Sequence, residues 1–597
     1  MYSFFALNIT KEKMMKIKIL VLITSIIGFC VSPAVAQMGD GNSVANTPRL
    51  NTTDRFVPVI GRNGMVTSRE KMATQVGADI LKQGGNAVDA AVAVGFALAV
   101  TYPQAGNIGG GGFMVIHLAE ENKSIAIDYR EMAPSGAHRD MYLNEDGSVD
   151  NDRSKYDAKA SGVPGTVAGM VHALENYGTM SLKEVMQPAY DLANDGFPMY
   201  NYLQSSLNGR KERLMANEAA GKVFYKADGA SYGYGEVLKQ KDLAWSLKQI
   251  MDGGKDAFYK GEIAKRIVAD QENHGGLITM DDMAAYVAVE RPAIVGEYKG
   301  HKVVTMPPPS SGGVHLVQIM NMLEEDDLKS KGHNGAATLH LYIEAMRQAY
   351  ADRSKYLGDP DFSNVPVAEL TSKKYAKLIR AQIPTDKARR STDIAPALDL
   401  LAESPDTTHF SVMDSQGNAV SNTYTLNFSY GNHMMAAGTG IMMNNEMDDF
   451  SAKPGTPNGY GLIGGEANSV QPKKRPLSSM TPTIVLKDDK PFFVTGSPGG
   501  STIITVVLQS VFNVLEFDMN AMHALAAPRI HHQWLPDAVM LEEGVSQDTK
   551  DILVDMGHII APPRFTLGSL STIMYKDGIF YGAADIRSMD AAAIGVD

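Results

Sequence analysis

The segment from Thr407 to Gly431, TTHFSVMDSQGNAVSNTYTLNFSYG, constrains the fold more than any other part of the sequence. Two runs rich in β-branched and aromatic residues are separated by the short stretch Ser415 to Asn418. Gly and Asn tolerate positive φ, so the stretch predicts a turn and the whole segment predicts a β-hairpin. If Asp414 and Ala419 flank the turn, facing residues have numbers that sum to 833, which places Thr407 opposite Leu426.

This register gathers three polar side chains, Thr407, Thr425 and Asn427, at the open end of the hairpin. A shift of one residue in the register leaves the cluster intact. Two interpretations are open at this point: the threonines serve only β-propensity in an edge hairpin, or they form a reactive site. Polarity alone favours the first interpretation.

The composition and charge restrict the class of protein. The chain has 597 residues, of which 44% are hydrophobic and 20% are charged, as in folded globular proteins. The formal net charge of -12 argues against a nucleic acid or an anionic membrane as partner, because both require basic patches on the protein.

The N-terminal residues predict export from the cytoplasm. Lysines from Lys11 to Lys18 precede an apolar run, Ile19 to Val31, and a small-residue site that ends at Ala36. This pattern predicts a signal peptide over residues 1–36, and a bacterial periplasmic protein. The apolar run is shorter than the ~20 residues that span a bilayer, so we expect no stable membrane anchor. The single cysteine, Cys30, lies inside the signal, so the mature chain has no disulfide and no thiolate site.

Three further segments are candidates for binding an anion. The run Gly109 to Gly112 lacks a phosphate-loop or dinucleotide motif, so close backbone packing is the favoured role. Arg130 follows a predicted strand and suits a carboxylate ligand, although an isolated arginine there is more often in a surface ion pair. Gly499 and Gly500 precede a predicted helix, Ser501 to Leu515, whose free N–H groups suit an anion or an oxyanion.

A possible lid and a possible metal site complete the candidates. The loop Pro454 to Gly465, which contains Tyr460, follows the acidic cluster Glu446 to Asp449, and this arrangement suggests a lid. His531 and His532 lack an acidic or thiol partner at suitable spacing, so we expect no metal.

A threonine nucleophile remains, because the sequence contains no HExxH, GxSxG or cysteine signature. A threonine at a chain terminus carries its own base, the α-amino group, whose pKa is near ~7.7–8.0. Thr407 is internal, so this mechanism requires a cut between Asp406 and Thr407. The polar, proline-containing stretch 385–405 makes such a cut physically reasonable, but residue chemistry alone leaves it open.

The sequence resembles the γ-glutamyltranspeptidase family. The hairpin carries the family signature, TTHFSV followed by GNAVSNTYTLN and YG. Further shared motifs, in order, are GGNAVDAA, GGGGF, DYREMAP, YADRSKYLGDP, NNEMDDFSAKPG, RPLSSMTPTIV, TGSPGGS and APRIHHQW. The resemblance implies an α+β fold, the αββα sandwich of N-terminal-nucleophile (Ntn) hydrolases. It also implies self-cleavage into a large subunit, 37–406, and a small one, 407–597, which remain together as a heterodimer.

The resemblance also implies the site residues. Thr407 would be the nucleophile, Thr425 would orient its amine, and Gly499 and Gly500 would supply oxyanion donors. The residues implied in substrate binding are Arg130, Ser478 and Ser479 for the α-carboxylate, Asn427, Glu446 and Asp449 for the α-ammonium, and Tyr460 in the lid.

The implied activity is transfer of the γ-glutamyl group of glutathione and similar compounds to amino acids, peptides or water, without cofactor or metal. One alternative is a glutaryl-cephalosporin acylase or a γ-polyglutamate-processing relative. The set Arg130, Ser478, Ser479 and Asp449 argues against the acylase, because it suits a free α-amino acid. A secreted, non-catalytic binding protein is the alternative from another class.

Overall fold

The structure is a computed structural model that describes residues 56–394, 407–562 and 566–597. The predicted signal peptide, with Cys30, lies outside the described residues. So do Asp406 and the second half of the stretch expected to lead into the hairpin.

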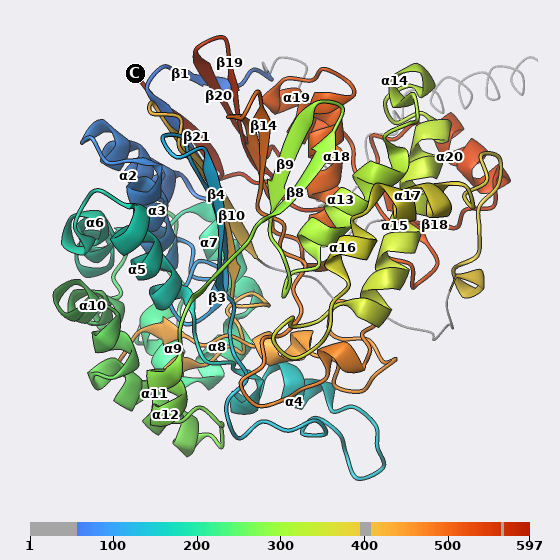
Figure 1. Ribbon diagram of the computed structural model, residues 1–597. Coiled ribbons are helices and arrows are strands. Elements are labelled where there is room, and N and C mark those ends of the chain that lie inside the picture. The colour runs from blue at the N-terminus through green and yellow to red at the C-terminus, as the bar shows by residue number, and fades with distance from the viewer. Residues whose placement is uncertain (1–55, 395–406, 563–565) are drawn as a thin grey trace, which may run out of the picture. The chain divides into compact units, whose positions relative to one another are not determined.

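Two seven-stranded antiparallel sheets lie face to face in the middle of the fold (Figure 1). The first consists, in spatial order, of β1 (Val59–Gly61), β20 (Ile579–Ala584), β19 (Ser571–Lys576), β15 (Lys490–Thr495), β14 (Thr483–Lys487), β9 (His301–Thr305) and β8 (Ile294–Tyr298). The second consists of β21 (Ala592–Val596), β2 (Gly64–Ser68), β10 (Thr408–Asp414), β11 (Ala419–Thr425), β3 (Gly111–Leu118), β4 (Lys123–Tyr129) and β7 (Val289–Arg291). Buried side chains such as Met413 and Ile484 fill the space between the sheets.

Helices cover the outer face of each sheet, on the left and right of Figure 1. The second sheet is covered by α2 (Lys71–Lys82), α3 (Ala87–Thr101) and α5 (Thr166–Tyr177), with α6 (Leu182–Asp195) and α10 (Lys241–Tyr259) outside them. The first sheet is covered by α13 (Gly312–Leu323), α15 (Ala336–Tyr356), α18 (Ile503–Leu515) and α19 (Ala521–Ala526). The predicted αββα sandwich is therefore confirmed.

The remaining elements lie around this sandwich, and most of them are short. The helices are α4 (Asn151–Lys155), α7 (Asn201–Gly209), α8 (Lys211–Ala216), α9 (Glu218–Phe224), α11 (Glu262–Asn273), α12 (Met280–Ala285), α14 (Leu328–Lys331), α16 (Val367–Leu370), α17 (Lys373–Arg380) and α20 (Gln547–Asp555). The strands are β5 (Phe197–Pro198), β6 (Val237–Leu238), β12 (Met435–Ala436), β13 (Ile441–Met442), β16 (Ile530–His531), β17 (Val539–Leu541) and β18 (Ile560–Ala561).

Helix α3 lies against the central strands because it is apolar on every side. All of its residues are buried, and Asn86 caps it by accepting hydrogen bonds from the N–H groups of Val88 and Asp89. The carboxylate of Asp89 accepts in return from the backbone N–H of Asn86, which completes a capping box.

The hairpin is not at a sheet edge, so that interpretation is wrong. Strands β10 and β11 lie at the centre of the second sheet, between β2 and β3. Facing residues sum to 832, as in Thr408 with Tyr424, so the predicted register is wrong by one residue. The reason is that the pairing with β11 ends at Met413, which faces Ala419, whereas Asp414 pairs only with β2. The Asp414 carboxylate stabilises the loop instead, because it accepts from the N–H groups of Gln416 and Asn418, both at 2.9 Å.

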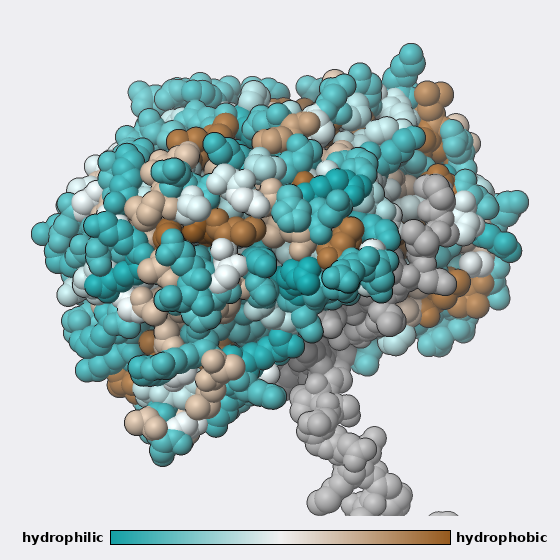
Figure 2. Space-filling model, turned by 90° about the horizontal axis from the view of Figure 1, so that it is seen from below, coloured by the Kyte–Doolittle hydropathy of each residue, from teal (hydrophilic) through white to brown (hydrophobic). Residues whose placement is uncertain are grey.

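Hydrophilic side chains predominate on the face shown in Figure 2, and hydrophobic residues lie between them in small groups. Scattered exposed apolar residues are normal for a folded protein. Within the described ranges, no helix has the length and hydropathy needed to cross a membrane.

Candidate active site

The open end of the hairpin brings the predicted cluster together. Thr407 directly precedes β10, and its Oγ1 lies 3.3 Å from Oγ1 of Thr425, the last residue of β11. The Thr425 hydroxyl also accepts a hydrogen bond from the backbone N–H of Asn427, at 2.9 Å. All three residues are buried, so the polar groups are held by protein partners rather than by bulk solvent.

The glycine run, Gly109 to Gly112, packs closely against this end of the hairpin. A Cβ atom at Gly110 would lie 2.0 Å from the carbonyl oxygen of Thr425, so no larger residue fits there. Asn107 bridges the two segments: its Nδ2 donates to that carbonyl at 2.9 Å, and its Oδ1 accepts from Gly110 N–H at 2.9 Å. The run therefore provides close backbone packing, the role favoured from the sequence.

A buried arginine lies beside this cluster. Arg130 follows β4, is fully buried, and donates to the carboxylates of Glu446 and Asp449 in a short 3₁₀ helix, Glu446–Asp449. Burial alone lowers the pKa of Arg130, but Glu446, Asp449 and Glu131 outweigh burial and raise it. The alternative of a surface ion pair is wrong, because this arginine is inaccessible to solvent.

Glu131 is a third carboxyl group that the sequence analysis did not single out. Its Oε2 lies 3.7 Å from Arg130 Nη1, and neither of its oxygens has a hydrogen-bond partner among the described residues. Burial raises the pKa of Glu131 to about 7, although Arg130 opposes the shift, and burial raises the pKa of Glu446 as well. One guanidinium therefore faces three carboxyl groups. When the carboxyl groups are ionised they outnumber the positive charge, so the site favours a further cationic group.

A second buried arginine, Arg353, was also missed. It comes from α15 and donates through Nη2 to Ser479 Oγ at 3.5 Å and through Nε to Ser311 Oγ at 3.1 Å. Within the described part of the chain, no carboxylate oxygen lies within ion-pair distance of it, and burial lowers its pKa to about 10. The motif YADRSKYLGDP contains this arginine, but its spacing gave no indication that it reaches Ser479.

The predicted oxyanion segment forms a tight turn rather than the direct start of a helix. Gly499 and Gly500 have φ angles of 141° and 53°, which only glycine adopts readily, and a 3₁₀ turn, Gly500–Thr502, precedes α18. A cavity of about 20 Å³, the size of roughly one water molecule, brings together most of the predicted site. The predicted residues that line it are Arg130, Thr407, Thr425, Asn427, Glu446, Asp449, Tyr460, Ser478, Ser479 and Gly500. Gly499 is adjacent in sequence but is not part of this lining.

The predicted lid loop lies directly over the site. Tyr460 is 5% exposed, and its hydroxyl donates to the carbonyl oxygen of Asn427 at 2.8 Å. Asn458 donates through Nδ2 to Oδ1 of Asp449 at 3.2 Å. The loop therefore contacts residues predicted to bind the substrate ammonium.

The two adjacent histidines contact other protein side chains, and neither is among the residues that line the small cavity at Thr407. His531 hydrogen-bonds Thr505 at 2.8 Å and Gln533 at 2.9 Å, and His532 lies 3.4 Å from Asp537. In the ranges that the structure describes, no group of three or more histidine, cysteine or acidic side chains is arranged to hold a metal ion.

The fold and site define the class of protein. An αββα sandwich with a buried threonine at the start of a central strand is the arrangement of an Ntn hydrolase, and structural neighbours of this chain are members of that class. A cephalosporin acylase from Bacillus halodurans matches with a TM-score of 0.79 and 26% identity, covering 94% of this chain and 100% of that chain. The γ-glutamyltranspeptidase of Helicobacter pylori matches with a TM-score of 0.54 and 45% identity, covering 56% of this chain and 95% of that chain.

The chain belongs to the γ-glutamyltranspeptidase family, whose model matches residues 73–595. It is 52% identical to the glutathione hydrolase proenzyme of Escherichia coli K12, over 91% of this chain and 93% of that protein. It is 36% identical to the acylase ACY 1 proenzyme of a Pseudomonas strain, over 92% of this chain and 96% of that protein. The family confirms the resemblance seen in the sequence and makes the chain a γ-glutamyltransferase.

Proposed function

We propose that this chain is a self-processing enzyme that cleaves the γ-glutamyl bond of glutathione and of similar compounds through an ester on Thr407. One observation carries the proposal: the Thr407 hydroxyl lies 3.3 Å from that of Thr425, in a cavity shared with Arg130 and Asp449. A nucleophile beside a cation and a carboxylate suits a substrate with a free glutamyl head group.

The first step of the proposed function is cleavage of the chain itself. Thr407 Oγ attacks the carbonyl carbon of Asp406, the peptide C–N bond breaks, and an ester forms while the nitrogen takes up the proton. Water then hydrolyses the ester and regenerates the hydroxyl. The products are the large subunit, 37–406, and the small subunit, 407–597, whose new α-amino group serves as a base.

The second step repeats this chemistry on the substrate. The Thr407 amine accepts the hydroxyl proton, Oγ attacks the γ-glutamyl carbonyl, and the departing amine takes the proton as the amide C–N bond breaks. Water or the amine of an amino acid or peptide then attacks the ester, and Oγ regains a proton. Thr425 orients the amine, and the backbone N–H groups at Gly499 and Gly500 stabilise the oxyanion.

The charged groups of the cavity are assigned to the substrate head group. Arg130 donates to the α-carboxylate together with Ser478 and Ser479, which line the same cavity. The remaining predicted ligands, which would bind the α-ammonium, are Asn427, Glu446 and Asp449. Tyr460 closes over the bound group, because its loop already contacts Asn427 and Asp449.

The proposal includes export. The basic and apolar residues before Ala36 are the basis for a cleaved leader over residues 1–36 and for a periplasmic enzyme. Amino-terminal sequencing of protein released from the periplasm should give a large subunit that begins at residue 37.

The decisive experiment combines chain analysis with turnover. Purified protein should separate under denaturing conditions into two chains, the smaller beginning at Thr407, and should hydrolyse a γ-glutamyl anilide. The variant Thr407→Ala should remain one chain and lose at least about 10³-fold in turnover. Thr572→Val is a matched control, because Thr572 is also buried and its hydroxyl has no partner among the described residues.

Two outcomes would contradict the proposal. A Thr407→Ala variant that behaves like the wild type would favour a non-catalytic binding protein. Faster turnover of glutaryl-cephalosporin than of glutathione would favour the acylase activity. This alternative is worth testing because one relative is named acylase ACY 1 proenzyme.

A further inference from the structure

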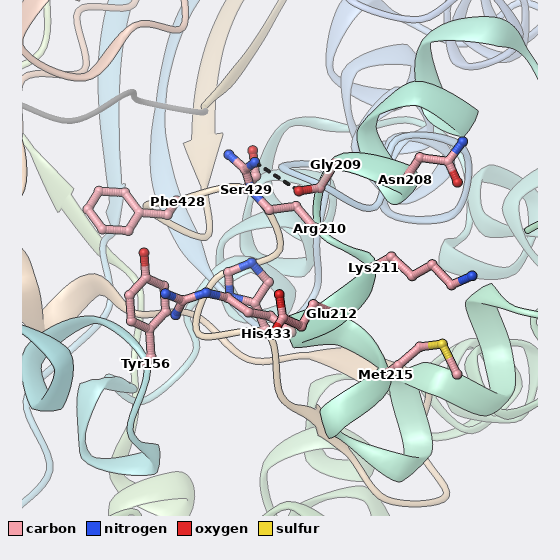
Figure 3. A pocket seen from close by; sticks show the side chains of 11 residues that line it. Tyr156, Asn208, Gly209, Arg210, Lys211, Glu212, Met215, Phe428, Ser429 and His433 are labelled. Atoms are coloured by element: carbon pink, nitrogen blue, oxygen red, sulfur yellow. Dashed lines mark hydrogen bonds between the residues drawn. The ribbon is translucent and has the colours of Figure 1, made fainter.

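A second, much larger cavity lies next to the proposed active site. It has a volume of about 790 Å³, and Phe428 and Ser429, which directly follow Asn427, form part of its lining (Figure 3). The ring of Phe428 packs edge-on against the ring of Tyr460, with centroids 5.3 Å apart. Since Tyr460 lines the small cavity at Thr407, the two rings form a wall that both cavities share.

The lining of the large cavity is cationic. Arg210, Lys211 and Arg213 come from the junction of α7 and α8, and Glu212 is the only acidic residue among the described residues that line the cavity. Counted over the described residues, none of the three cations has a carboxylate oxygen within 4.0 Å. Figure 3 shows the Lys211 side chain directed away from His433, whereas the guanidinium of Arg210 donates through Nη1 to the carbonyl oxygen of Gly209 at 3.4 Å.

Arg213 is held in a fixed orientation at this cavity. Its guanidinium carbon lies 3.5 Å from the centroid of the Tyr156 ring, and the Tyr156 ring is in turn 5.6 Å from the ring of His433. Stacking on an aromatic face leaves the edge of a guanidinium, with its N–H donors, available to a planar anion. Arg210 and Arg213 therefore provide two sources of charged donors.

His433 adds a neutral donor that is not used inside the protein. It is 5% exposed and lines the cavity, and neither ring nitrogen has a hydrogen-bond partner among the residues described. Burial lowers the pKa of His433 to about 3, with Arg213 and Arg210 contributing, so the ring is neutral and carries one N–H. A buried polar group without a partner is costly, and a bound ligand would supply the missing partner.

We propose that this cavity binds the C-terminal carboxylate of the short peptide that leaves the γ-glutamyl group or accepts it. The proposal rests on γ-glutamyl transfer at Thr407, as proposed above. Two guanidinium groups and one imidazole N–H match the lone pairs of a carboxylate. An extended dipeptide spans roughly 7 Å. In the proposed pose its amine faces Thr407 and its carboxylate extends past Phe428 and Tyr460, whose rings are in contact, into the larger cavity.

The double variant Arg210→Gln/Arg213→Gln tests the subsite. With glutathione as donor, whose leaving dipeptide has a carboxylate, KM should rise about tenfold or more. With a γ-glutamyl anilide, whose leaving group has none, KM should change less than about twofold. As acceptor, glycylglycine should need about tenfold higher concentration for half-maximal transfer, whereas glycylglycinamide should behave as with the wild type.

The control is Lys222→Gln, which removes one exposed cation that pairs with Glu218 on α9 and does not line the cavity. It should leave all four measurements unchanged. Equal effects of the double variant on glutathione and the anilide, or no effect on either, would overturn the subsite. If the wild type does not hydrolyse the anilide at all, the proposed function is contradicted. Failure of the subsite and failure of the proposed function are therefore distinguishable.

Discussion

Glu131 makes the charge balance of the site depend on pH. Burial raises its pKa to about 7 in the folded protein, from the usual value of 4.5 for a glutamate. Between these values the folded state binds a proton that the unfolded chain releases. The stabilisation is therefore fully present below about pH 4.5 and is lost as the pH rises towards about 7.

We expect Glu131→Gln to make the stability of the folded protein less dependent on pH. The melting temperature of the wild type should fall between about pH 5 and 8 more steeply than that of the variant. Glu120→Gln is the control, because Glu120 is exposed and its removal should leave the slope unchanged. The same slope in Glu131→Gln as in the wild type would show that Glu131 holds no extra proton.

Arg353 is expected to act on the substrate through Ser479. Its Nη2 donates to Ser479 Oγ at 3.5 Å, and no carboxylate oxygen among the described residues lies within ion-pair distance of it, although the charge of Asp449 acts on it from further away. Since hydrogen bonds to charged groups contribute ~1.5–3 kcal/mol, Arg353→Met should raise donor KM about tenfold or more, with a smaller change in kcat. Arg353→Lys should recover part of the loss, because it restores the charge.

The substrate itself separates this role from a structural one. A γ-glutamyl anilide whose α-carboxylate is converted to an amide should show the same KM with Arg353→Met as with the wild type. Lys355→Met, an exposed position on the same helix, is the control. An equal loss with both donors would mean that Arg353 only supports the fold.

At the scale of single residues, the sequence predicted the cluster and, through the family resemblance, most of the cavity lining, but not Glu131 and Arg353. Thr407, Thr425 and Asn427 were placed together because strand pairing is periodic, and a register error of one residue does not separate them. Glu131 and Arg353 were missed for a physical reason. Arg353 acts through Ser479, 126 residues further along the chain, and no local pattern encodes such a contact. Glu131 is next to Arg130 in the sequence, but its raised pKa comes from burial, which depends on the whole fold.

At the scale of elements, the glycine run limits where strand β11 can end. A Cβ at Gly110 would lie 2.0 Å from Thr425 O and 2.8 Å from Asn107 Oδ1, so Gly110→Ala must displace the end of the strand. Such overpacking typically costs ~1–3 kcal/mol. We expect a lower melting temperature and slow or absent self-cleavage, because the Thr425 hydroxyl moves away from Thr407.

Gly136→Ala provides the comparison. The nearest atom to a Cβ at Gly136 belongs to Leu277 and lies 3.7 Å away, an ordinary contact. This variant should melt and cleave like the wild type, measured by thermal unfolding and by the fraction of two-chain product on a denaturing gel. Normal cleavage in Gly110→Ala would contradict the role given to close packing.

Elements are most predictable where one local signal decides them. Helix α3 follows from its apolar run and from Asn86, which caps it. Strand β2 ends at Ser68, and α2 begins at Lys71 because Glu70 provides the cap by accepting from Met72 and Ala73. The central position of the hairpin was not predictable from its own residues, since sheet order depends on strands from both ends of the chain.

At the scale of the whole molecule, both sheets combine strands from before and after Thr407. In the second sheet, β10 pairs with β2 and β11 pairs with β3, so strands of the predicted small subunit lie between strands of the large one. In the first sheet, β14 pairs with β9 and β20 pairs with β1. A cut at 406/407 breaks one peptide bond but none of these ladders.

Self-cleavage should therefore leave the particle intact. In native buffer, the two chains should elute together from a size-exclusion column, at the volume of uncleaved Thr407→Ala. In guanidinium chloride they should separate, because the denaturant disrupts the mixed sheets and the core between them. A native peak that contains only one of the two chains would mean that the interleaved strands do not hold the subunits together.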